Sequence, residues 1–254
     1  MLLTVDDTNL IAQEEIEDSR DIMTMDEFQQ EWYCSFEASI KGAYFARELS
    51  LMREQGRIKI VPYDEGLKVH TVWDLGIGQA MGVGFFQRVM NEIKMIDYWE
   101  GSNKEGIPQA IKAIKNKSYV YGLHFAPHDI NTTDIGTGKT RKETASSLGI
   151  EVEDVPRMSV DDGISAAKLF LNKLWVDKNN CEIWLDYIAQ YHQEWDDNRG
   201  MFTQKPYKDF TSHAADVLRY AALVENKMTN EDFGADQLAR IQENRQRRLV
   251  NELL

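Results

Sequence analysis

The stretch His70–Gly78, with the sequence HTVWDLGIG, decides how this chain is expected to fold. Its apolar and β-branched residues predict a buried strand, and Gly76 and Gly78 predict a turn directly after it. Asp74 lies inside the apolar run. A carboxylate at such a position is costly to bury unless it is paired or binds a metal ion. The alternative interpretation is that Asp74 only helps to form the turn before Gly76.

The residues that follow predict a mixed α/β sheet. Two β-rich runs, MGVGFFQRV and EIKMIDYWE, are separated by Met90-Asn91, the pattern of a hairpin. The stretch IPQAIKAIKN predicts an amphipathic helix with Pro108 near its first turn, and SYVYGLHFAP predicts a fourth strand that ends at Pro127. A polar loop, a short helix and a strand near EVEDVPR come next. Three helices are expected at about 160–175, 181–197 and 211–227.

This order predicts three antiparallel strands followed by parallel strands that need helical crossovers, with helices flanking the sheet. It is the ribonuclease H-like topology, although alternating α/β order alone is shared by many folds. Residues 69–227 would form this domain. Residues 1–68 predict a linker and a helical lead segment, with a helix capped by Asp26, a second helix that ends at Gly56, and the short extended piece RIKIVPY. Residues 228–254 predict a charged tail helix.

Composition limits the classes of function. The 254 residues are 43% hydrophobic, which suits a domain with a sizeable core, and no apolar run approaches the roughly 18 residues of a membrane span. Cys34 and Cys181 have no CxxC spacing, so a reducing cytosol is expected and a disulfide framework or zinc ribbon is not. The net charge of −13 argues against a nucleic-acid binder. Two basic segments are exceptions, the loop at 139–142 and the arginine-rich tail at 240–248.

Acidic residues gather where the predicted elements end. Asp129 follows the fourth strand, and it would lie beside Asp74 if the first and fourth strands are neighbours; alone, it could equally be an ordinary loop residue. In DFTSHAADVLRY, residues Asp209, His213 and Asp216 are spaced for one face of a helix, with Asp209 alternatively a cap before it. Three such acids can bind two divalent cations, Mg²⁺ or Mn²⁺, roughly 3.5–4 Å apart, which clamp the oxygens of a phosphodiester.

Several of these motifs resemble one family. The runs TVWDLGIG, YGLHFAPHD followed by TGKTRKE, the DGI of DDGISAAKLFLNKLWVD, and KDFTSHAADVLRYAAL resemble, in order and spacing over about 69–223, the nuclease domain of tailed-phage terminase large subunits. The segment FQQEWYCSF to GAYF resembles the stretch that joins that family's ATPase domain to its nuclease. The resemblance implies a ribonuclease H-like endonuclease that cuts concatemeric viral DNA by a two-metal mechanism during genome packaging.

By motif, the resemblance places the catalytic, metal-binding acids of the family on Asp74, Asp129 and Asp216, with His213 as a fourth metal ligand. It implies double-stranded DNA as substrate, the host cell cytoplasm as location, no membrane, and an ATPase motor domain, small terminase and portal as partners of the full-length protein. No GxxxxGK[ST] motif occurs, and Gly138-Lys139-Thr140 lacks the first glycine of a P-loop. The chain therefore looks like the nuclease half alone.

Other interpretations stay open. Lys139, Arg141 and Lys142 either contact DNA phosphate near the cut or form a solvated basic loop. Asp97 and Asp162 are reserve candidates for the site. An actin-like phosphotransferase or ATPase, a non-catalytic packaging docking module, and a resolvase or integrase are the competing functions. Tight ATP binding without nuclease activity would favour the first of these three.

Overall fold

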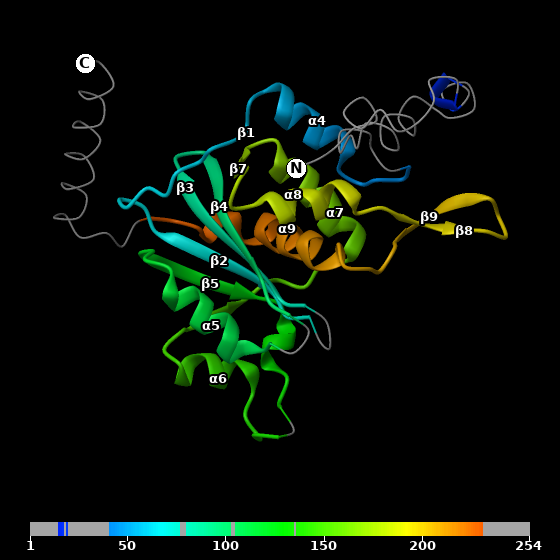
Figure 1. The fold of residues 1–254 in the computed structure, drawn as a ribbon. Helices are drawn as coiled ribbons and strands as arrows, with labels where there is room; N and C mark the ends of the chain where they lie inside the picture. The colour runs from blue at the N-terminus through cyan, green and yellow to red at the C-terminus, as the bar shows by residue number, and fades with distance from the viewer. Residues whose placement is uncertain are drawn as a thin grey trace, which may run out of the picture.

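The computed structural model describes residues 15–17, 19, 41–76, 80–102, 105–134 and 136–230. The helix predicted from Asp26, the glycine at position 78 and the part of the predicted tail helix from residue 231 onward lie outside these residues. Figure 1 shows a central sheet with helices on both of its faces. No helix in the described part of the chain is long and apolar enough to cross a membrane.

The sheet has seven strands in the order β1-β7-β4-β3-β2-β5-β6. Strands β2, β3 and β4 are antiparallel neighbours, whereas β5 pairs in parallel with β2, β6 with β5, and β7 with both β4 and β1. This is the predicted ribonuclease H-like mixed sheet, three antiparallel strands and then parallel ones. The bounds are β1 Ile58–Lys59, β2 Val69–Asp74, β3 Gly82–Val89, β4 Glu92–Glu100, β5 Tyr121–Ala126, β6 Val152–Asp154 and β7 Leu174–Asp177.

Each face of the sheet has its own hydrophobic core. On one face, α5 and α6 pack with Trp73 and Phe85; on the other, α4, α7, α8 and α9 pack with Val72 and Phe86 (Figure 1). Successive residues of β2 therefore point to opposite faces, and all six are buried, as expected for a central strand. The helices are α4 Ala46–Glu54, α5 Ile107–Asn116, α6 Arg141–Ser147, α7 Val160–Leu171, α8 Glu182–Gln190 and α9 Ser212–Val224, with one-turn 3₁₀ helices η1 His128–Asn131 and η2 Glu225–Lys227.

Local sequence explains where several helices begin. Thr140 caps α6, because its side chain accepts the Glu143 N–H and the Glu143 carboxylate accepts the Thr140 N–H, a capping box. Ser159 caps α7 by accepting the N–H of Asp162. The predicted helix over 211–227 is confirmed as α9 followed by η2. The helix predicted to end at Gly56 is found as α4, which is shorter than the predicted stretch, because residues 41–45 before it are not helical.

Two predicted helices extend too far. The helix predicted at 160–175 ends at Leu171, and Leu174–Asp177 is instead the strand β7 between β1 and β4. The helix predicted at 181–197 ends at Gln190, and a separate hairpin follows, formed by β8 Gln193–Asp196 and β9 Met201–Pro206. Periodicity alone cannot assign a short apolar run to a helix or a strand. In this chain, Leu174–Asp177 is a strand because it pairs with β1 and β4.

Candidate active site

Asp74 lies at the carboxyl end of the central strand β2, on the face that α9 covers. Its side chain is 11% exposed, and its Oδ2 lies 2.6 Å from Nδ1 of His213, which is in the first turn of α9. Burial raises the pKa of Asp74, an effect that the His213 hydrogen bond only partly offsets. Burial alone would lower the pKa of His213, but the hydrogen bond and the charge of Asp74 raise it. The two side chains therefore stabilise each other's charged forms.

The backbone at Gly76, just after β2, lies against this pair. A Cβ atom on Gly76 would lie 2.1 Å from the Ala80 carbonyl oxygen and 2.8 Å from Cε1 of His213. Only glycine leaves room for so close an approach. Gly76 thus lets the backbone after β2 lie close to the His213 ring.

Asp216 follows His213 by about one turn of α9. Its Oδ1 accepts hydrogen bonds from Arg219, at 3.0 Å from Nε and also from Nη2. The Asp216 side chain is 26% exposed and that of Arg219 is 10% exposed. The third predicted acid is therefore held by an arginine from its own helix.

Asp129 lies in η1, directly after β5. Because β5 pairs with β2, the predicted neighbourhood of Asp74 and Asp129 is confirmed at the level of the strands. The Asp129 side chain is 42% exposed, and its Oδ1 lies 3.0 Å from Nε2 of His128. Asp129 is thus the most open of the three acids.

One cavity of about 410 Å³ brings the predicted residues together. Asp74, Asp129, His213 and Asp216 all line it, and so do Arg219 and Tyr220 from α9. Within the described residues, no group of three or more His, Cys, Asp or Glu side chains is arranged as a metal centre. Asp216 binds Arg219, and Asp129 lies against His128. The chemistry of the donors nevertheless fits Mg²⁺ or Mn²⁺, because carboxylate oxygens are the ligands that these ions prefer.

Three further residues of the site carry no role in the sequence analysis. Glu100 ends β4 at the same edge of the sheet, since Gly82 of β3 pairs with both Asp74 and Glu100. Burial raises the pKa of Glu100, and its charge raises the pKa of His213. Arg219 and Tyr220 line the cavity directly. Glu100 has a signal in the sequence, because it ends an apolar strand, but the arginine and tyrosine are ordinary residues of an amphipathic helix.

The reserve and alternative acids have structural partners outside this cavity. Asp209 precedes α9, and its Oδ1 accepts the Thr211 N–H at 2.9 Å and the Thr211 hydroxyl at 2.5 Å. Asp97 is buried on the opposite core face, where it pairs with Lys117 and accepts the Tyr119 hydroxyl at 3.0 Å.

Asp162 receives a hydrogen bond from the hydroxyl of Ser159, the cap of α7, at 2.7 Å. The predicted DNA-binding residues also lie outside the cavity lining. Lys142 forms an ion pair of 2.6 Å with Asp154, Arg141 begins α6, and Lys139 is exposed. Their contact with DNA stays a prediction.

Comparison with known proteins gives matches in structure but not in sequence. No protein-family model and no curated protein matches the chain. The large terminase of the thermophilic bacteriophage D6E superposes with a TM-score of 0.53 at 15% identity, over 89% of this chain and 55% of that one. The nuclease domain of the P22 large terminase superposes with a TM-score of 0.51 at 18% identity, over 67% of this chain and 89% of that domain.

The chain thus spans about half the length of the D6E protein and most of the P22 nuclease domain. Likeness at these identities establishes the fold, and the fold is the one that the sequence motifs imply. The chain has the ribonuclease H-like fold of large terminase nuclease domains.

Proposed function

We propose that this chain is a divalent-metal-dependent endonuclease that cuts double-stranded DNA during the packaging of a tailed-phage genome. The observation that carries the proposal is the convergence of Asp74, Asp129, Asp216 and His213 on one cavity, from two neighbouring strand ends and one helix. The likeness of the fold to large terminases supports the packaging context. An ATPase motor domain, small terminase and portal would be the partners in the complete machine.

Asp74, Asp129 and Asp216 would hold two Mg²⁺ or Mn²⁺ ions, with His213 as a fourth ligand. Bound ions of this kind activate a water molecule and stabilise the charge on the leaving oxygen. A divalent cation would also stabilise the charged form of Asp74. This carboxylate is buried, and its hydrogen bond with His213 only partly offsets the effect of burial on its pKa.

The side chains of this protein have separate tasks around those ions. In the neutral ring with its proton on Nδ1, facing Asp74, His213 would offer Nε2 as the acceptor for a cation or a water proton. Arg219 and Lys208 also line the cavity and add positive charge where a phosphate would lie. Gly76 lets the backbone after β2 lie close to the His213 ring.

The test is incubation of the purified chain with supercoiled plasmid in Mn²⁺, Mg²⁺ or EDTA. Nicked and then linear DNA should form with either metal, with little sequence preference, and EDTA should abolish both products. Asp97→Asn is the matched control, since its carboxylate is buried on the other face of the sheet, and it should cut once its folding is verified. Full activity in EDTA would refute the proposal.

A further inference from the structure

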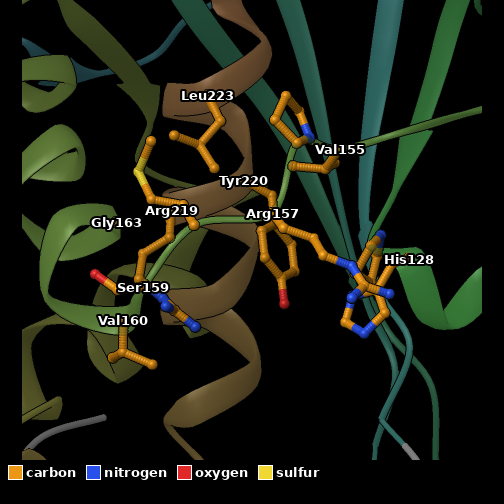
Figure 2. Close-up of a pocket in the computed structure, with 12 residues that line it drawn as sticks. His128, Val155, Arg157, Ser159, Val160, Gly163, Arg219, Tyr220 and Leu223 are labelled. Carbon is orange, nitrogen blue, oxygen red and sulfur yellow. The ribbon is translucent and has the colours of Figure 1, made fainter.

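A second cavity adjoins the active-site cavity and carries only positive charge. Its volume is about 260 Å³, and Figure 2 shows the residues that line it. Among these described residues, Arg157, Arg219 and His128 are basic and none is acidic. Arg219 and Tyr220 line both cavities, so the two spaces adjoin each other at α9. We call this space the cationic cavity.

Three separate segments build the cationic cavity, and each is tied to the active site. His128 precedes Asp129 in η1, Arg157 lies between β6 and α7, and Arg219 comes from α9. Figure 2 shows Tyr220 between Arg219 on one side and Arg157 and His128 on the other. A ligand in this cavity would therefore lie next to the predicted catalytic acids.

Arg219 is held in place at the border of the two cavities. Its guanidinium binds Asp216, and its aliphatic part lies against the backbone of Gly163 in α7. A Cβ atom at position 163 would come within 3.3 Å of both Cδ and Nη1 of Arg219. Glycine inside a helix lowers helix stability by about 1 kcal/mol relative to alanine. At position 163 the glycine leaves room for the Arg219 side chain.

Arg157 differs from Arg219 because its charge has no counter-ion among the residues that the structure describes. Its side chain is exposed, and no residue in the described ranges forms a hydrogen bond or an ion pair with its guanidinium. The hydroxyl of Tyr220 likewise makes no hydrogen bond to any described group. In a chain with a net charge of −13, the cavity thus offers a free guanidinium and a free hydroxyl donor to an anion.

We propose that the cationic cavity binds a backbone phosphate of the DNA strand, next to the phosphate that is cut, with Arg157 as its principal ligand. A guanidinium matches two phosphate oxygens with parallel N–H donors, which makes it the best side chain for this contact. The inference rests on the proposed function, because it assumes that the neighbouring cavity is where DNA is cut. It adds a residue that positions the substrate, away from the metal-binding acids.

The experiment measures binding of a fluorescent DNA duplex by anisotropy, at low salt and in EDTA, so that cleavage does not contribute. Arg157→Gln should weaken binding about ten-fold and reduce the slope of log Kd against log salt by about one. Arg47→Gln is the matched control: Arg47 is exposed on α4 and lines neither cavity. In Mn²⁺, Arg157→Gln should raise KM for plasmid cleavage and change kcat little.

Equal DNA affinity of the Arg157→Gln and Arg47→Gln variants would overturn the inference. It would also be overturned if inorganic phosphate bound the wild-type cavity and lost affinity in Arg157→Gln, while DNA affinity stayed the same, because the ligand would then be free phosphate. Failure of the proposed function looks different: wild-type protein would not cut DNA in any metal, whereas the effect of Arg157 on binding would be measured all the same.

Discussion

Arg219 forms an ion pair with Asp216, the carboxylate that is proposed to bind the metal. The guanidinium and the metal ion should therefore compete for Asp216. The guanidinium contacts Oδ1 of Asp216 through Nε at 3.0 Å and through Nη2, and both side chains are largely shielded from water. The charge of Arg219 also lowers the pKa of the nearby Asp74. The change Arg219→Gln removes this cation from both acids.

The structure sets the size of the expected effect. An ion pair with one partner 26% exposed is worth about 1 kcal/mol, at the upper end for pairs near a protein surface. Metal binding must give up this contribution in the wild type but not in Arg219→Gln, so the variant should bind Mn²⁺ about five-fold more tightly. Without metal, its free energy of unfolding should fall by about 1–2 kcal/mol, because Asp216 loses its partner in a half-buried position.

Calorimetric titration with Mn²⁺ measures the affinity, and thermal melting in EDTA measures the stability. Arg219→Lys is the control, since it keeps the positive charge beside Asp216 and should bind Mn²⁺ close to the wild-type level. The reasoning would be refuted if Arg219→Gln bound Mn²⁺ as weakly as the wild type or more weakly.

Three further predictions each concern a single residue. Burial lowers the pKa of His124 to about 4 from 6.5, so its proton binds only the unfolded chain between these values and stability falls as pH drops through this window. Between pH 7 and pH 5 the wild type should lose about 2 kcal/mol more unfolding free energy than His124→Asn in urea titrations, and equal losses would contradict this. In calorimetry, Asp216→Asn should lose a Mn²⁺-binding event that Asp209→Asn retains, because Asp209 bonds to the backbone and hydroxyl of Thr211; the opposite pattern would move the ligand to Asp209. Lys139→Glu should weaken DNA binding in a salt-dependent way, and unchanged affinity would leave this exposed lysine as part of a solvated loop.

Much of the architecture around the site could be predicted from the sequence. The alternating and apolar runs predicted the strands β2 to β5, and the need for crossovers predicted that the later strands pair in parallel. The structure shows that β5 lies beside β2. That pairing places Asp74 and Asp129 at one edge of the sheet. The spacing of Asp209, His213 and Asp216 suited a single helix face, and it is the alternative, with Asp209 before the helix and Asp216 inside it, that α9 shows.

What could not be predicted depends on contacts between distant segments. The strand β7 has four residues, and its strand conformation comes from pairing with β1 and β4. The hold of Arg219 on Asp216 depends on the room beside Gly163, which no local pattern shows. Arg157 lies in a stretch with no distinctive motif. Its proposed role in binding phosphate follows only from the cavity that three segments of the chain form.

The most direct test of the central claim is plasmid cleavage by Asp74→Asn in Mn²⁺. This side chain is the buried acid at the centre of the site, and asparagine has the same shape, can still accept the His213 hydrogen bond and lacks the charge that a cation requires. The variant should show a melting temperature in EDTA at or above that of the wild type, because burial and the nearby charge of Asp216 both disfavour the charged form of Asp74, and it should produce no nicked or linear DNA. Cleavage by this variant at the wild-type rate would contradict the assignment of the active site.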